Sequence, residues 1–356
     1  MNETTLNAAV ETIEAPAEVD TRALAFKPWW VTSLKTRAAA ILGLDVVLFI
    51  FFTIFSPGHV FFSVANSNNL LLSGTEVMLL SVGLALLLGA GIFDLSLGAN
   101  LVLSSVVSAK VIVAIAGTSG SPNHILLASL AGIVAAVFTG MIFGLLNGIL
   151  VAIVGINALI ATLGTLGIGT GVAYVISGGS DITGLPAQLQ ENFGLKEFGP
   201  IPAPAIVAIV VAILAFVLMR FTRFGVQTVG IGSSRVAASR AGIRVSRHLI
   251  ALTVIAGALA GLAGFVDITH FAGTTIEGHS NDALSAVTAV VIGGTLLEGG
   301  RVSIPGAVWG TGLAVILQGG LVIIGVSSYY QLMAVGLALI VAVGIDRGSV
   351  TKWDKL

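Results

Sequence analysis

Long apolar runs separated by short polar stretches dominate the chain, and this pattern predicts helices that cross a membrane. A hydrocarbon core about 30 Å thick needs roughly 20 apolar residues in one helix. About ten suitable runs can be recognised, at 38–55, 70–90, 99–116, 124–154, 156–176, 203–221, 248–271, 284–297, 304–324 and 330–345. We therefore expect an all-α, polytopic membrane protein with about ten transmembrane helices, several of them broken by glycine.

Lysine and arginine gather at only some of the joints between these runs. Cytoplasmic loops of membrane proteins collect these cations, whereas short translocated loops do not. The cationic clusters precede the first run, separate the sixth from the seventh and the eighth from the ninth, and follow the tenth (Lys27, Lys35, Arg37, Arg220, Arg223, Arg235, Arg240, Arg244, Arg247, Arg301, Arg347, Lys352 and Lys355). Because an even number of runs lies between successive clusters, we predict that both termini are cytosolic.

The two ends of the chain are polar. Residues 1–37 contain five acidic side chains and no apolar run, so they lack the features of a cleaved signal peptide. We predict a disordered, acidic cytosolic tail that leads into a basic pre-membrane segment. Residues 38–346 form the transmembrane domain in this scheme, with a cytoplasmic loop at 222–247, and residues 347–356 form a cytosolic C-terminal tail.

Composition excludes several classes of protein. With 56% hydrophobic and 9% charged residues, a soluble enzyme would lack an interior large enough for its apolar side chains. The net charge of −1 gives no reason to expect a nucleic-acid partner. There is no cysteine, no Gly-Lys dipeptide of a phosphate-binding loop and no His-Glu-x-x-His sequence. We therefore expect no enzymatic activity, no metal site and no cofactor in this chain, and any ATP must be bound by another polypeptide.

Glycine interrupts the apolar runs at regular places. Rows of small residues recur at a spacing of four, as in Gly140, Gly144 and Gly148, and such rows favour close helix packing over a direct role in substrate contact. The loop at 222–247 predicts a short helix that Ser233 or Ser234 caps and that ends at Gly242. Its apolar face would be Val236, Ala237 and Ala241. Spacing alone leaves open whether this loop is only a topology signal or a surface that contacts a partner.

Four blocks together carry a family resemblance. They are Gly-Ile-Phe-Asp-Leu-Ser-Leu-Gly at 91–98, Asn-Gly at 147–148 with Ile-Ala-Thr-Leu-Gly-Thr at 160–165, the loop segment 230–243, and the glycine-rich segment 290–306. In this order they resemble ribose-type (carbohydrate) ABC importer permeases, the inner-membrane components of binding-protein-dependent transport systems. The chain departs from the family pattern at Phe93, at Ala158 and at 283–285, where Ala-Leu-Ser stands in place of Glu-Leu-Asp.

The resemblance implies a permease subunit that translocates a sugar or related polyol across the bacterial cell (inner) membrane. Its partners would be the lipid bilayer, a second permease subunit in a homo- or heterodimer, two ATPase subunits that bind the ATP, and an extracytoplasmic solute-binding protein. The residues implied to contact the ATPase are Arg235, Ala238, Arg240, Gly242 and Ile243. The residues implied to form structural motifs are Gly91, Asp94, Ser96, Gly98, Gly293, Gly294, Gly299 and Gly300.

Polar residues inside the runs are the remaining candidates. Asn147, Asn157, Thr162 and Thr165 can line a sugar-sized path, although interhelical hydrogen bonding is the role that we favour for each of them from the sequence. Asp45, Glu76 and Asp94 would couple ions in an alternative function, that of a secondary transporter. A second alternative is an ABC permease for branched-chain amino acids. His270, Glu277, His279 and Asp282 follow the seventh run, where we expect a solvated outer loop with docking contacts in preference to a metal site.

Overall fold

The computed structural model describes residues 37–117, 122–279 and 282–327, together with short stretches between 329 and 340. Both predicted cytosolic tails lie outside the described residues, apart from Arg37. In the described part, eight helices are long and apolar enough to cross a membrane. They are α3 (Arg37–Phe55), α4 (Val64–Gly89), α5 (Leu97–Ala116), α6 (Pro122–Ala152), α7 (Ala158–Ser177), α9 (Ala203–Phe221), α12 (Val245–Phe271) and α14 (Ile304–Ile323). They correspond to eight of the predicted runs, which confirms the all-α, polytopic class.

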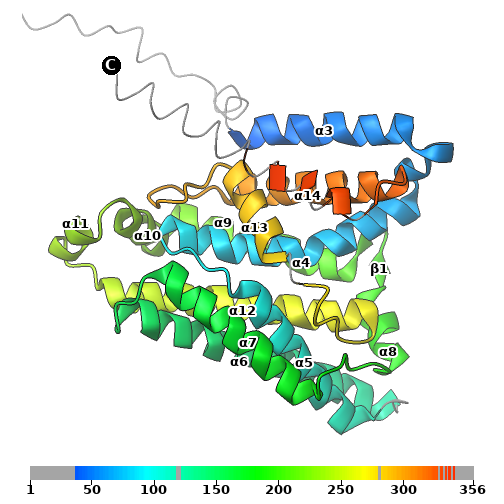
Figure 1. Ribbon diagram of the computed structural model, residues 1–356, viewed down its shortest axis with the longest axis horizontal. Helices are drawn as coiled ribbons and strands as arrows, with labels where there is room; N and C mark the ends of the chain where they lie inside the picture. Colours follow the sequence, from blue (N-terminus) through cyan, green and yellow to red (C-terminus); the bar gives the residue numbers. More distant parts are fainter. Residues whose placement is uncertain are drawn as a thin grey trace, which may run out of the picture. The chain divides into compact units, whose positions relative to one another are not determined.

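Shorter elements connect these helices (Figure 1). They are η2 (Pro57–Phe62), α8 (Ala187–Leu189), η3 (Gln190–Gly194), α10 (Arg223–Ser233), α11 (Arg235–Arg240) and α13 (Asp282–Ile292). Strands β1 (Glu197–Phe198) and β2 (Ile201–Pro202) form one small antiparallel pair, in which Glu197 faces Pro202.

The prediction of a full transmembrane helix at 284–297 is wrong. Helix α13 has 11 residues, so it rises about 16 Å and reaches about half-way across a hydrocarbon core. It stops because Gly293 packs against the backbone of Gly306 and Gly294 adopts a φ of +86°, which turns the chain out of the helix. The last predicted run, 330–345, lies largely outside the described residues.

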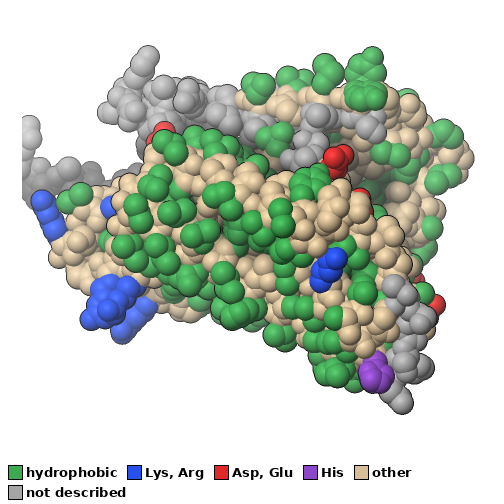
Figure 2. Space-filling model, turned by 60° about the horizontal axis from the view of Figure 1, so that its bottom comes forward, with side chains coloured by type: hydrophobic (Ala, Val, Ile, Leu, Met, Phe, Trp, Pro, Cys, Tyr) green, Lys and Arg blue, Asp and Glu red, His purple; other side chains and the backbone are tan. Residues whose placement is uncertain are grey.

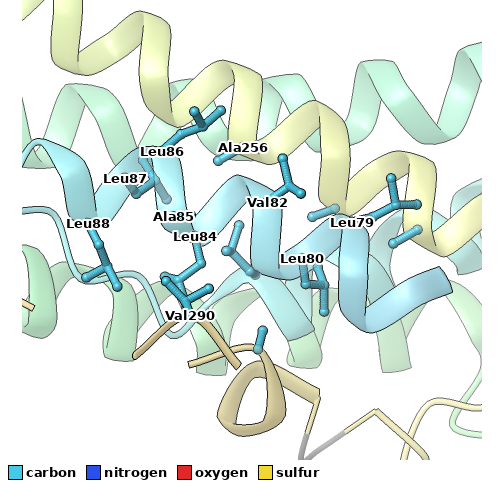
Figure 3. Packing of buried hydrophobic residues seen from close by; sticks show 14 of the residues in the cluster. Leu79, Leu80, Val82, Leu84, Ala85, Leu86, Leu87, Leu88, Ala256 and Val290 are labelled. Carbon is cyan, nitrogen blue, oxygen red and sulfur yellow. The ribbon is translucent and has the colours of Figure 1, made fainter. Parts of the chain in front are cut away.

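Helix α4 forms the centre of the bundle. Most of its residues are buried, whereas most of α3 is exposed. Its apolar side chains from Leu79 to Leu88 point to all sides and meet Ala256 of α12 and Val290 of α13 (Figure 3). A helix that is apolar all round belongs in an interior. The polar side chains in its buried part, such as Thr75 and Glu76, are therefore enclosed by other helices and have little contact with lipid.

Small residues set the close contact between α6 and α12. A Cβ atom on Gly140 would collide with the carbonyl oxygen of Gly257, and one on Gly261 would collide with Ala136. The amide of Asn100 on α5 lies 3.3 Å from the Gly140 carbonyl and 3.4 Å from the Gly257 carbonyl, and donates a hydrogen bond to each. The predicted packing role of the glycine rows is confirmed, because only the missing side chains allow the two backbones to approach.

The outward-facing side chains of the described residues are mainly apolar (Figure 2). On α3, for example, Val47 and Ile54 are each 60% exposed. Lysine and arginine side chains gather at the end where α10 and α11 lie (Figures 1 and 2). The apolar side chains therefore form a surface suited to contact with lipid, and the cationic side chains lie at one end of it.

Candidate functional site

The break between α4 and α5 holds a buried polar network. Asp94 is 3% exposed, and its Oδ1 accepts hydrogen bonds from the backbone N–H of Ser96 at 2.8 Å and from the Ser96 hydroxyl at 2.6 Å. The side-chain amide of Asn147 on α6 donates to Ser96 Oγ at 2.8 Å and to Asp94 Oδ2 at 3.4 Å. The break is therefore a fixed, hydrogen-bonded turn that joins α5 to α6.

Helix α7 is tied to the same turn. The Thr162 hydroxyl donates to the carbonyl oxygens of Phe93 at 3.3 Å and Ala158 at 2.8 Å. Thr165 is also buried and donates within its own helix, to the Thr162 carbonyl at 3.3 Å. Asn157 is exposed and caps the start of α7 by accepting the Leu159 N–H at 2.9 Å. Of the four predicted path residues, the structure thus brings Asn147 and Thr162 to the break, while Asn157 lies at a helix end.

Three glycine-containing segments that are far apart in the sequence meet at the end of α4. The Gly300 N–H donates to the Gly89 carbonyl at 3.1 Å. A Cβ atom on Gly232 of α10 would collide with both of these backbone groups, and one on Gly299 would lie 2.9 Å from Gly232 Cα and from Gly91 N. We call Gly89, Gly91, Gly232, Gly299 and Gly300 the glycine junction. It places α10 in direct contact with the α4–α5 break and with the loop after α13.

Helix α11 protrudes next to this junction. Ser234 caps it by accepting the Ala237 N–H at 3.2 Å, and Gly242 follows its end with a φ of +82°. Arg235 and Arg240 are exposed, and Ala238 is 5% exposed. The predicted helix, its serine cap and its glycine end are confirmed.

The side chains of the predicted apolar face do not pack against the bundle. Val236, Ala237 and Ala241 are exposed, because so short a helix packs against the bundle through Ala238 and leaves its other sides free. The preceding helix α10 was not predicted either. Beside the two helices lies a cavity of about 460 Å³, lined by Arg220, Phe221, Thr222, Arg223, Val226, Gln227, Ala241 and Ile243.

A second cavity, of about 420 Å³, lies between α5, α7 and the segment after α12. Its polar lining residues are Thr170, Tyr174, Glu277 and His279, and the Tyr174 hydroxyl donates to Glu277 Oε1 at 3.4 Å. Its other lining residues are Leu95, Gly98, Ala99, Val102, Leu166, Ile276 and Ala283. Non-helical backbone inside a membrane protein is tolerated where it lines such a cavity. Sequence reasoning missed Thr170 and Tyr174, although with Thr162 and Leu166 they recur every fourth residue on one face of α7.

Comparison with known proteins assigns the chain to a transport family. The family described as "Branched-chain amino acid transport system / permease component" matches residues 66–344. The chain belongs to this permease family. It is 34% identical to the ribose import permease protein of Bacillus subtilis (strain 168) over 87% of this chain and 92% of that protein. It is 32% identical to the D-allose transport system permease protein of Escherichia coli (strain K12), over 90% and 94%.

A third relative has a similar extent. The galactose/methyl galactoside import permease protein of Haemophilus influenzae is 29% identical, over 85% of this chain and 92% of that protein. No solved structure matches the chain. The family assignment confirms the resemblance carried by the four sequence blocks, three of which reach the glycine junction.

The permease also contains a cluster of acidic and histidine side chains at the far end of α12 from α11. His279 Nε2 lies 2.9 Å from Asp267 Oδ1, and its Nδ1 lies 2.6 Å from Asp282 Oδ2. Glu76 Oε2 is 3.9 Å from the same Nδ1. Burial disfavours the charged imidazole, but the hydrogen bonds to Asp267 and Asp282 outweigh burial and raise the pKa of His279 to about 11. The expectation of a solvated loop is wrong for His279, which is 6% exposed, whereas Glu277 is exposed as expected.

The third predicted intramembrane carboxylate, Asp45, lies apart from both sites. It is 6% exposed on α3, and a Cβ on Gly312 of α14 would be 3.3 Å from its Oδ2. Neither of its carboxylate oxygens has a hydrogen-bond partner among the described residues. It therefore contributes no polar contact to the cavity or to the glycine junction.

Proposed function

We propose that the chain is the membrane-spanning permease subunit of an ABC importer that carries a sugar or related polyol into a bacterial cell. The observation that carries this proposal is the similarity, over nearly the full length, to permease proteins named for ribose, D-allose and galactose import. The family description names branched-chain amino acids. The individual relatives above all carry sugar names, which favours a sugar as the substrate.

The cavity between α5 and α7 is the proposed substrate path. Hydroxyl, phenol and carboxylate groups at Thr170, Tyr174 and Glu277 offer hydrogen bonds that suit a polyhydroxylated ligand. Thr162 continues the same face of α7 toward the α4–α5 break. We propose that Thr162, Thr165 and Asn157 extend the path from the cavity along α7, and that Asn147 joins it at the α4–α5 break as part of the Asp94 network.

The α11 segment is the proposed contact with the ATPase subunits. The exposed Arg235 and Arg240 and the open space around Gly242 leave room for a partner surface. A displacement of α10 and α11 would reach the α4–α5 break through Gly232, because these backbones are in contact. We propose two ATPase subunits that bind the ATP, a second permease subunit, and a solute-binding protein on the opposite side of the inner membrane.

The arrangement of the helices also supports a topology with both termini in the cytosol. Gly300 contacts Gly89 and lies next to Gly232, so Arg301 lies on the same side as the arginines of α10 and α11. Helix α13 is too short to cross alone. Together, α13 and its flanking segments lead the chain from the far end of α12 to the side on which Arg301 lies. We propose that this composite crossing counts as one of ten passages through the membrane.

Affinity purification of the tagged chain in mild detergent, followed by mass spectrometry of stoichiometric partners, tests the proposal. We expect an ATPase subunit to co-purify and sugar uptake into proteoliposomes to require ATP and the binding protein. A folded chain that is recovered alone, and whose uptake follows an ion gradient, would instead support the secondary-transporter alternative.

A further inference from the structure

The acidic and histidine cluster draws ionisable side chains from four parts of the chain. Glu76 lies on α4, Asp267 and His270 on α12, His279 in the segment after α12, and Asp282 at the start of α13. One ligand atom from each of Glu76, His279 and Asp282 lies within 4.8 Å of the other two. The three segments therefore converge on a space of the size that a metal ion with three protein ligands occupies.

Several polar atoms at this space are buried and lack partners. Glu76 is 6% exposed and Asp267 is fully buried. Glu76 Oε1, Asp267 Oδ2 and His270 Nδ1 form no hydrogen bond with any described residue. Leaving carboxylate oxygens buried without a donor is costly. Among the described residues only imidazoles form ion pairs with these carboxylates, so the cluster carries an excess of acidic groups.

The orientation of His279 matches that of a metal-bound imidazole. Its Nε2 lies 2.9 Å from Asp267 Oδ1 and 2.8 Å from the Thr275 hydroxyl, which in turn donates to Asp267 at 3.2 Å. Metal-binding histidines commonly donate the N–H of their second nitrogen to a carboxylate in this way. Nδ1 is thereby directed at Glu76 and is hydrogen-bonded to Asp282 Oδ2 at 2.6 Å. This hydrogen bond would have to open to about 3.3 Å to admit the ion.

We propose that Glu76, His279 and Asp282 coordinate a divalent transition-metal ion, with Zn²⁺ as the best match to one nitrogen and two carboxylate ligands. His270 Nδ1 lies 3.8 Å from Glu76 Oε1 and is not one of the three converging ligands, so a water molecule would take the fourth tetrahedral position. Mg²⁺ and Ca²⁺ are disfavoured because they prefer oxygen ligands alone. Asp267 is a positioning residue that holds the ring of His279.

The metal would act as a structural cross-link beside the proposed path. It would join α4 to α12 and to the start of α13, and His279 also lines the cavity of about 420 Å³. Binding requires the loss of the proton from His279 Nδ1, so Zn²⁺ and this proton compete for the same position. The inference does not depend on the sugar or on the ATPase, and it is tested without either.

The test uses the full chain in lipid nanodiscs, purified without a polyhistidine tag and stripped of metal with a chelator. Zn²⁺ is titrated in competition with a chromophoric chelator, and Co²⁺ is added in a parallel sample to report coordination geometry by its visible spectrum. We expect one Zn²⁺ per chain and a tetrahedral Co²⁺ spectrum. Glu76→Gln should weaken Zn²⁺ binding at least tenfold, as should Asp282→Asn.

Glu191→Gln is the matched control. Glu191 is an exposed carboxylate of η3, which packs against α12, so its loss should leave the Zn²⁺ affinity unchanged. The proposal is overturned if the unaltered chain takes up no stoichiometric Zn²⁺, since the cluster then holds protons alone. It is also overturned if Glu191→Gln weakens binding as much as Glu76→Gln. Should the Glu76 and Asp282 variants fail to fold, the Zn²⁺ stoichiometry and the Co²⁺ spectrum of the unaltered chain decide the question.

Discussion

The glycine junction yields a specific prediction, because the backbones there are in contact and a single added methyl group would overlap with neighbouring backbone atoms. Gly232→Ala places a Cβ atom against the Gly89 carbonyl and the Gly300 N–H, which are hydrogen-bonded to each other. Backbone atoms cannot move aside as the end of a flexible side chain can. Gly230, two residues earlier in α10, is the matched control, since a Cβ there meets nothing within 4 Å.

The expected cost follows from two contributions. Inserting a methyl group into close-packed backbone costs about 1–3 kcal/mol. Loss of the hydrogen bond between Gly300 and Gly89 costs roughly 0.5–1.5 kcal/mol more. Alanine's better helix propensity offsets about 1 kcal/mol of this cost. Gly232→Ala should therefore destabilise the junction by about 0.5–3.5 kcal/mol. Gly230→Ala should be neutral or stabilising by up to about 1 kcal/mol, because alanine has a higher helix propensity than glycine.

Two measurements check this reasoning. Thermal unfolding of the purified chain in detergent should show a lower midpoint for Gly232→Ala than for Gly230→Ala. ATP-driven uptake by the reconstituted importer should fall in the first variant, while Gly230→Ala keeps uptake near the level of the unaltered chain. If the two variants unfold at the same temperature and transport equally well, the contact between α10 and the α4–α5 break does not have the role assigned to it.

Three further predictions concern other residues. Gly242→Arg should prevent co-purification of the ATPase, because the arginine side chain fills the space that the ATPase surface requires. Gly242→Ala has the same backbone cost of about 1–2 kcal/mol at positive φ and should still retain the ATPase. Equal retention by both variants would contradict the assigned contact. Asp45→Leu should raise thermal stability by about 1–3 kcal/mol, because it removes a buried carboxylate without a described partner; loss of uptake would show instead that transport uses the carboxylate. Tyr174→Phe should raise the KM for sugar uptake about fivefold with assembly intact, because the proposed hydrogen bond from the cavity-lining Tyr174 hydroxyl to the sugar, worth about 1 kcal/mol, is lost. An unchanged KM would place the substrate elsewhere.

Local features were predictable from the sequence wherever neighbouring residues decide them. The eight long helices follow from runs of apolar residues, because the length of a run shows whether a helix of that length can span the hydrocarbon core. The limits of α11 follow from Ser234 and Gly242, whose effects extend over one helical turn. The end of α13 was missed, because Gly293 and Gly294 resemble many other glycines in apolar runs. Only contact with Gly306 of α14 distinguishes Gly293 from them.

The sequence by itself determined that this is a multi-pass membrane protein, and its motif blocks placed it in a transport family. Only the tertiary structure decided which blocks share a site. It brings Gly89, Gly232 and Gly300 into contact, and it encloses Glu76 with Asp267 and His279. Hydropathy can be read from one run of residues. The close approach of two backbones and the burial of a side chain depend on which distant segments pack against that run. His279 therefore looked solvated in the sequence and is buried in the fold.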